Sequence, residues 1–159
     1  MKVYFAHIFS HLIYLNPLWS SVQEYRMNEL KVLQNKAIKS ILRLPWRTPS
    51  VSLNNVRFLP MDVINEYETI LLFFKLSGGC IKHGVKLMKN DEIHAHFTRS
   101  NKQYHLNQIH TVRYGRKGIL HGGLLLYNNI INSIKITMFK SKLRLYLWMS
   151  YLDSLKQRV

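Results

Sequence analysis

The chain has 159 residues, which fits one domain or two small helical subdomains, and its 47% hydrophobic and 12% aromatic content excludes a disordered tail. Twenty-three Lys and Arg against eight Asp and Glu give a formal net charge of +15, which a polyanion or counterions must neutralise. Nucleic acid is the polyanion that we expect, and an anionic membrane surface is the alternative, because it attracts the same cations.

Cysteine usage and hydropathy indicate the compartment. Cys80 is the only cysteine, which excludes an internal disulfide framework and a multi-cysteine zinc module and favours a reducing compartment. The N-terminal apolar run does not predict a secretory signal, because four polar residues interrupt it: His7, Ser10, His11 and Asn16. The longest apolar block, Ile70 to Phe74, is far shorter than the roughly 18 residues of a membrane span. We expect a soluble or peripheral intracellular protein, cytoplasmic or nuclear, that is not secreted.

The first predicted helix runs from Val3 to Asn16. Its apolar residues recur at intervals of three and four: Tyr4, Phe5, Ile8, Phe9, Leu12 and Ile13. Only Met1 and Lys2 precede it, without a capping sequence. We interpret this abrupt start as the cut edge of a longer protein, and we expect the apolar face to lack its partner.

A second helix is predicted after the break at Asn16-Pro17. Ser21 and Glu24 form a capping box, and the helix should run to about Arg43, where Leu44-Pro45 stops it. The expected apolar stripe consists of Leu30, Leu33, Ala37, Ile38 and Ile41. The cations of this helix are spread around its other sides, which is typical of a solvated face.

A loop over residues 45–55 precedes a third predicted helix, from about Asp62 to Leu76, which Ser77-Gly78-Gly79 ends. Its buried side should consist of Ile64, Tyr67, Ile70, Leu71 and Phe74. Glu66 and Glu68 lie near its N-terminal end, where acids are favoured, so we interpret them as structural.

The pattern is weaker beyond residue 80, where we place a boundary between a helical segment, 1–79, and a basic segment, 80–159. We expect a short helix over Val85 to Lys89 and a strand or extended segment over Tyr104 to Tyr114. Glycines punctuate the apolar run Ile119 to Tyr127, which suggests a helix or bend packed closely against a neighbour. Helical spacing returns from Thr137 to Leu155. The predicted fold is mainly α, a helical bundle followed by a mixed basic segment with a terminal helix.

The sequence contains no assembled catalytic or metal site. Phosphoryl transfer on nucleic acid generally needs two or three carboxylates around Mg²⁺, whereas Asp62, Asp91 and Asp153 lie in three different predicted elements. No Gly-x-Ser-x-Gly elbow is present. Five histidines match no zinc spacing: His94, His96, His105, His110 and His121. We expect no catalytic residue and no cofactor in this chain.

The strongest electrostatic feature is the acid-free stretch from Ile93 to Leu152, which contains nine Lys or Arg and five His. Aromatic residues are interleaved with these cations as possible stacking surfaces. Gly115-Arg116-Lys117-Gly118 has the form of a phosphate-clamping Gly-x-x-Gly loop, with a plain turn as the alternative. We predict phosphate contacts from eight residues: Arg99, Lys102, Arg113, Arg116, Lys117, Lys140, Lys142 and Arg144.

Two series of short motifs run along the chain. The first comprises Ser10-His11-Leu12-Ile13-Tyr14, Trp19, Leu33-Gln34-Asn35-Lys36-Ala37-Ile38-Lys39, Leu59-Pro60 and Phe74-Lys75. The second comprises His94, Thr98-Arg99-Ser100, Arg113-Tyr114-Gly115, Gly122, Tyr127-Asn128 and Phe139-Lys140-x-Lys142-Leu143-x-x-Tyr146-Leu147. Their order resembles the thumb and C-terminal tail of non-LTR retrotransposon reverse transcriptases, of the Jockey and CR1 type, over nearly the whole chain.

The resemblance implies part of an RNA-directed DNA polymerase whose Asp-Asp pair and Mg²⁺ belong to a palm upstream of Met1. The implied partners are RNA or an RNA/DNA duplex, together with the missing fingers and palm. Two departures suggest a decayed or fragmentary copy. Leu15 replaces a glycine that commonly follows the first motif, and Tyr127-Asn128-Asn129-Ile130-Ile131 replaces a Trp-Asn-x-Leu-Pro run.

The same positive charge is also compatible with a different function. The basic amphipathic helix predicted over Thr137 to Leu155, with Trp148 and Tyr151 at an interface, is also typical of a peripheral membrane or protein-interaction module.

Overall fold

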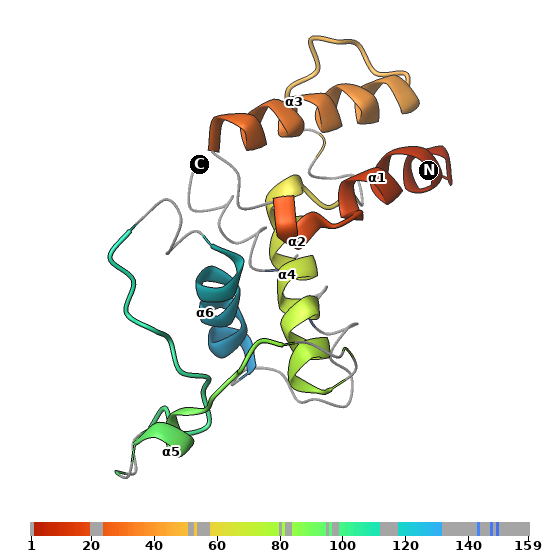
Figure 1. The fold of residues 1–159 in the computed structure, drawn as a ribbon. Coiled ribbons are helices and arrows are strands. Elements are labelled where there is room, and N and C mark those ends of the chain that lie inside the picture. The colour runs from red at the N-terminus through yellow and green to blue at the C-terminus, as the bar shows by residue number, and fades with distance from the viewer. Residues whose placement is uncertain are drawn as a thin grey trace. The chain divides into compact units, whose positions relative to one another are not determined.

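The computed structural model describes residues 2–19, 24–50, 53, 58–79, 81, 84–94, 96, 99–111, 118–131, 143, 147 and 149. Within them the chain is mainly helical, as predicted, and contains no β-strand. In chain order (Figure 1), the helices are the π-helix η1 (Tyr4–Phe9), α1 (Ser10–Ile13), α2 (Asn16–Trp19), α3 (Glu24–Ile41), α4 (Met61–Ser77), α5 (Asn90–Ile93) and α6 (Ile119–Ile131). None of these helices has both the length and the apolar character that crossing a bilayer requires.

The chain divides into two compact units. Unit 1 comprises Met1–Glu68 and Leu147–Val159, and unit 2 comprises Thr69–Tyr146. The change from one unit to the other falls inside α4, so this helix supplies side chains to both cores. The predicted division at residues 79 and 80 was drawn where the helical pattern weakens, and it stays a prediction.

The N-terminal helix is confirmed, but it ends earlier than predicted. Helical structure continues from η1 through α1 and stops at Ile13, before the turn at Tyr14 and Leu15. Leu15 has a φ of 49°, in the left-handed region that side chains disfavour. The indole of Trp19 donates a hydrogen bond to the Tyr14 carbonyl at 2.7 Å, which closes this turn. Asn16-Pro17 therefore opens the short helix α2 instead of ending the first one.

Part of the apolar face of the first helix has a partner within its own chain, so the expectation of an uncovered face is wrong for Tyr4. Tyr4 is 1% exposed and forms a core cluster with Ile38, Leu53 and Phe58. The ring centroids of Tyr4 and Phe58 are 4.5 Å apart in an edge-to-face arrangement, which favours this contact beyond simple burial. Phe5, predicted to share the buried face, is exposed.

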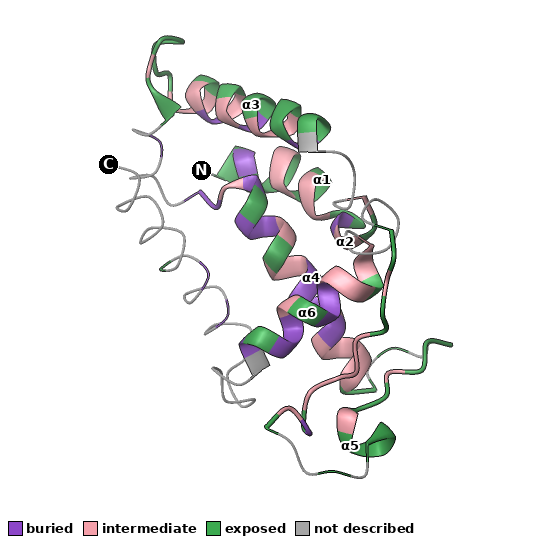
Figure 2. Ribbon diagram, turned by 90° about the vertical axis from the view of Figure 1, so that its left-hand side faces the viewer, coloured by how far each residue is buried: buried purple, intermediate pink, exposed green. Residues whose placement is uncertain are grey.

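Helix α3 forms where predicted, but its buried side is turned from the predicted stripe. Leu33 is 58% exposed, whereas Met27, Gln34 and Ile38 are buried (Figure 2). The side-chain amide of Gln34 donates hydrogen bonds to the Tyr4 hydroxyl at 2.8 Å and to the Leu59 carbonyl at 2.9 Å. Both amide hydrogens are thus satisfied, which makes burial of this polar side chain tolerable.

Helix α4 is confirmed within one residue at each end. Its N-terminal half belongs to unit 1, where Lys31 pairs with Asp62 at 2.9 Å and Asn16 donates to the Asn65 side chain at 2.7 Å. The glycine stop is also confirmed, since the Gly78 N–H bonds to the Phe74 carbonyl and Gly79 has a φ of 69°. Ile64, Ile70 and Leu71 are buried as predicted, and Phe73 is buried in addition.

The core of unit 2 is built from the end of α4, from α6 and from the segment around Tyr104. Helix α6 confirms the predicted close packing, because a Cβ on Gly123 would lie only 2.8 Å from Cδ2 of the Phe73 ring. The buried Tyr127 hydroxyl lies 2.9 Å from the Ser77 hydroxyl. Burial raises the pKa of Tyr127 above its ordinary value, and the bond to Ser77 acts in the opposite direction.

Asn128 ties α6 to the chain at Tyr104. Its side-chain oxygen accepts from the Tyr104 N–H at 3.0 Å, and its amide donates to the Tyr104 carbonyl at 2.8 Å. Tyr104 also forms an isolated antiparallel bridge with Lys89. Asn128 lies next to Tyr127 on a buried helix face, and its side chain satisfies both the N–H and the carbonyl of Tyr104, which is not part of a β-strand.

The helix predicted over Val85 to Lys89 is wrong. Residues 85–88 have no regular structure and pair with the segment after residue 100, since the His105 N–H bonds to the Met88 carbonyl at 2.8 Å. A single helical turn, α5, follows instead at Asn90–Ile93. Of the predicted strand or extended segment from Tyr104 to Tyr114, residues 105–111 have no regular structure and the last three lie outside the described residues.

Only three residues of the predicted terminal helix, Thr137 to Leu155, are described. Leu143, Leu147 and Met149 are each helical. Leu143 and Leu147, four residues apart, are buried, while Met149 is exposed, which agrees with an amphipathic helix. The rest of that prediction lies outside the described residues.

Candidate nucleic-acid interface

The structure describes two of the eight predicted phosphate contacts. Arg99 and Lys102 lie in a turn of unit 2, and both are exposed. The other six lie outside the described residues, and their role stays a prediction: Arg113, Arg116, Lys117, Lys140, Lys142 and Arg144.

The turn that carries Arg99 and Lys102 also lies beside acids. The Asp91 N–H donates to the Asn101 carbonyl at 3.2 Å, and the Asn90 amide donates to the Ser100 carbonyl at 2.9 Å. Helix α5, with the exposed Asp91 and Glu92, is therefore fixed next to this turn. Two carboxylates therefore lie on the segment that contacts this turn.

The histidines of unit 2 come together in part. The rings of His94 and His105 are 5.8 Å apart between centroids, and His105 Nδ1 lies 3.2 Å from Asn90 Oδ1. Within the described ranges, no three His, Cys, Asp or Glu side chains are grouped so that they could hold a metal ion. A hollow of about 450 Å³ lies beside His105 and His121, but aliphatic side chains make up most of its wall.

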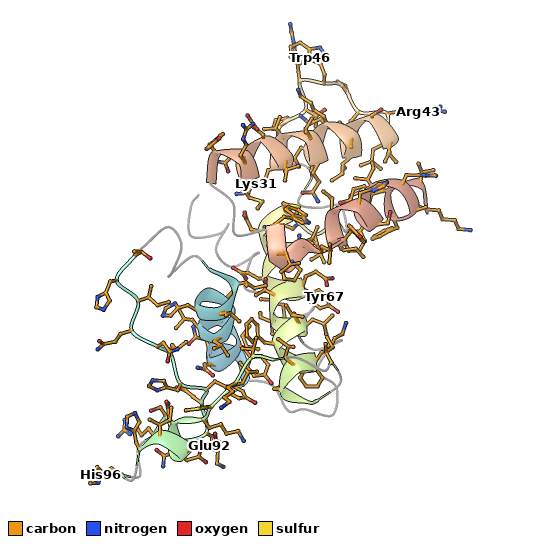
Figure 3. All side chains as sticks on the ribbon, in the orientation of Figure 1. Lys31, Arg43, Trp46, Tyr67, Glu92 and His96 are labelled. Atoms are coloured by element: carbon orange, nitrogen blue, oxygen red, sulfur yellow. The ribbon has the colours of Figure 1, made fainter. Side chains whose placement is uncertain are left out.

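A second basic surface, in unit 1, was not predicted. We call it the Trp46 surface and define it by the residues around a hollow of about 380 Å³ and by Arg47, whose guanidinium lies at the indole. The hollow is lined by Val32, Asn35, Lys36, Lys39, Ser40, Leu44, Trp46 and Ser50. Arg43, at the end of α3, points away from Trp46 (Figure 3). Figure 3 shows Trp46 projecting away from the helices at the loop that follows α3.

The end of α3 fixes the backbone of this surface. The Leu44 N–H bonds to the Lys39 carbonyl at 2.9 Å and the Arg43 N–H to the Ser40 carbonyl at 3.1 Å, which is the Schellman pattern of a helix C-terminus. Arg43 occupies the left-handed position of this motif with a φ of 53°, where glycine is usual. The cost of an arginine here is about 1–2 kcal/mol, and its side chain is exposed.

The loop after α3 then holds Trp46 in place. The Pro45 carbonyl accepts from the Thr48 N–H at 3.0 Å and from the Thr48 hydroxyl at 2.7 Å, which closes a tight turn. The Lys39 ammonium donates to the Trp46 carbonyl at 3.2 Å. The guanidinium carbon of Arg47 lies 5.0 Å from the centre of the indole, at cation–π distance.

The charge of this surface has one sign. Residues 30–61 contain no Asp or Glu and six Lys or Arg: Lys31, Lys36, Lys39, Arg43, Arg47 and Arg57. In the part of the chain that the structure describes, the ion pairs are Arg26 with Glu29 and Lys31 with Asp62. On the Trp46 surface, Lys36, Lys39 and Arg47 thus carry positive charge that no described carboxylate neutralises.

Two signals in the sequence point to the Trp46 surface. One is the acid-free window 30–61, which is shorter than the stretch from Ile93 to Leu152, and the other is a tryptophan between Pro45 and Arg47. The cations of α3 were interpreted as an ordinary solvated face, and the loop as a simple connection. Neither signal indicates by itself that the tryptophan is exposed.

No family model, curated protein or solved structure matches this chain. The resemblance to reverse transcriptases thus depends on the motif residues themselves. Several of these residues meet in the structure, since Gln34 of one motif bonds to Leu59 of another and Trp19 bonds to Tyr14. Leu15, where the family commonly has glycine, has the left-handed backbone that glycine favours.

Proposed function

We propose that this chain binds the phosphate backbone of RNA or of an RNA/DNA duplex without reading its sequence, as the thumb and tail part of a non-LTR retrotransposon reverse transcriptase. The observation that carries the proposal is the Trp46 surface, with its three cations, Lys36, Lys39 and Arg47, that lack a described carboxylate partner. The net charge of +15 supports it, because a polyanion relieves the self-repulsion of such a chain.

The assignment to a thumb and tail is supported by the roles of the motif residues. Gln34 and Leu59 connect two motifs through a buried hydrogen bond, and Asn128 anchors a third to Tyr104. The left-handed turn at Leu15 gives a physical reason for a glycine in related sequences. If this chain shares the architecture of that family, the residues that carry the resemblance should also stabilise the fold, as Gln34, Leu59 and Asn128 do.

No step of polymerisation is assigned to this chain. The family's Mg²⁺ needs converging carboxylates, and the described residues contain no such group. In the proposal, the chemistry belongs to fingers and a palm on another part of the parent enzyme. The role of this chain is to hold the template or the primer duplex.

Phosphate binding predicts a specific salt dependence. Engaging four phosphates should give a slope of about −3.6 for log K against log salt on duplex, so affinity should fall about 150-fold between 50 and 200 mM salt. Fluorescence anisotropy with two labelled duplexes of unrelated sequence measures this. We expect equal affinities for the two duplexes, and a slope near zero would refute phosphate binding.

Two further measurements separate the alternatives. Replacing Arg113, Arg116 and Lys117 by Ala should weaken binding to both duplexes alike if the acid-free stretch adds phosphate contacts. Flotation with anionic vesicles tests the membrane alternative. If the chain floats with these vesicles but does not bind RNA, the proposal is contradicted.

A further inference from the structure

We propose that Trp46 is a stacking platform for an unpaired base, which makes the Trp46 surface a binding site for single-stranded nucleic acid. The inference rests on the proposed function and deepens it, because it assigns a strand type to one surface. It follows from the exposure of the ring, the rigidity of its backbone, the shape of the hollow and the sign of the charge.

The indole of Trp46 contributes little to the core. The residue is 79% exposed, whereas aromatic residues such as Tyr4 and Phe73 are fully buried in their units. An exposed indole offers a large flat apolar face, and base stacking on such a face is worth about 5- to 150-fold in affinity per base. Every base has a similar π-face, so this contact requires no particular sequence.

The position of the ring is prepared before any ligand binds. The Lys39 bond to the Trp46 carbonyl and the Thr48 bonds to the Pro45 carbonyl fix the backbone on both sides. Arg43 and Leu44 hold the preceding Schellman turn. A fixed backbone lowers the entropy lost on binding, which is the advantage of a preorganised site.

The hollow beside the ring has the features that a nucleotide needs. Val32 and Leu44 add apolar wall to the indole, and the amide of Asn35 can donate to or accept from a base edge. Lys36 and Lys39 line the same hollow and suit the adjacent phosphates. Its volume of about 380 Å³ lies in the range of small-ligand pockets, roughly 300–1,000 Å³.

Charge and geometry select the occupant. Three cations without a described carboxylate partner, Lys36, Lys39 and Arg47, favour a polyanion over an apolar or basic peptide. In a duplex, each base is covered above and below by its neighbours, so only the terminal pair could stack on Trp46. A single strand offers unpaired bases along its length.

The test compares single-stranded and duplex RNA on the full chain. Trp46→Ala should weaken binding of a short oligouridylate about 5-fold or more and leave binding of a blunt RNA duplex within about 2-fold. Trp46→Phe keeps a ring and should retain most of the affinity. Tyr25→Ala is the matched control, because Tyr25 is also exposed on unit 1 and also has an arginine over its ring, Arg26 at 4.9 Å. It should change neither affinity.

A second measurement needs no variant. An abasic strand of the same length carries the same phosphates without bases, so it should bind the wild-type chain as weakly as oligouridylate binds Trp46→Ala. Equal affinity for abasic and uridylate strands would overturn the inference. So would an equal loss on single strand and duplex in Trp46→Ala, or a loss only on anionic vesicles.

The two proposals fail in different ways. If the wild-type chain binds both RNA forms with the expected salt slope and Trp46→Ala changes nothing, only the stacking inference is wrong. If the wild-type chain binds neither form, the proposed function is wrong as well.

Discussion

Two substitutions at neighbouring positions of α3 test which of its faces is buried. The structure and the sequence pattern predict opposite effects of these substitutions on stability. The sequence pattern places Leu33 in the core and leaves Gln34 on the surface, so it predicts that Leu33→Gln is costly and Gln34→Met is harmless. The structure reverses both, because Leu33 is 58% exposed and Gln34 is 4% exposed.

The magnitude for Gln34→Met follows from its two hydrogen bonds. Methionine has a similar length but no donor, so the buried Leu59 carbonyl loses its partner, which costs about 1–3 kcal/mol. Loss of the bond to the Tyr4 hydroxyl adds about 0.5–1.5 kcal/mol. We expect a total of about 2–4 kcal/mol, a large share of the roughly 5–15 kcal/mol that stabilises a typical domain.

Leu33→Gln should cost less than about 1 kcal/mol, because most of its side chain is already in water and both residues have good helix propensity. Urea unfolding followed by circular dichroism measures both variants against the wild type. Equal destabilisation by the two substitutions, or a larger cost at Leu33, would refute the register and the buried link between Gln34 and Leu59.

Three further predictions test individual positions. Leu15→Gly should be more stable than Leu15→Ala by roughly 0.5–1 kcal/mol in urea unfolding, because φ is 49° at this residue and glycine adopts that conformation without strain. At most positions alanine is the more stable of the two. If alanine were more stable here too, the left-handed conformation of Leu15 would be wrong. Gly123→Ala should destabilise unit 2 by about 1–3 kcal/mol in thermal unfolding through overpacking against the buried Phe73, whereas Gly84→Ala meets nothing within 4 Å and should have little effect. Burial raises the pKa of Tyr127 above its ordinary value of 10.0, so folding favours the neutral phenol. Its contribution to the free energy of unfolding is therefore complete below pH 10 and is lost as the pH rises through the raised pKa. Tyr127→Phe should reduce this loss of stability at alkaline pH, and an unchanged loss would contradict the raised pKa.

The helices that periodicity and punctuation define together were predictable. The pattern of α4 has a proline before it and two glycines after it, and both ends were predicted within one residue. The face of α3 was not predictable, because the burial of Gln34 depends on two partners far away in the sequence, Tyr4 and Leu59. Residues 85–88 were mistaken for a helix for a similar reason, since pairing with the segment after residue 100 decides their conformation.

The location of the Trp46 surface was not predictable from composition. The excess of Lys and Arg predicts anionic partners, but composition alone does not separate cations beside carboxylates from cations that no described carboxylate contacts. Arg99 and Lys102 lie beside the acids of α5, whereas Arg43 and Arg47 have no described carboxylate partner. Arg43 also ends α3 without the glycine that normally marks such a turn, so no residue type in the sequence indicates the Schellman motif.

The central claim is that the cations of the Trp46 surface bind nucleic-acid phosphate, and the salt dependence of a charge-neutralised variant tests it most directly. Lys36 and Arg47 are replaced together by Gln, and Lys39 is kept because it holds the Trp46 carbonyl. The matched control replaces Lys86 and Lys89, which are also exposed, and removes the same charge. We predict that the first variant lowers the magnitude of the salt slope on duplex RNA by about 1.8, while the control keeps nearly the wild-type slope. Equal slopes for the two variants would contradict a phosphate site at the Trp46 surface.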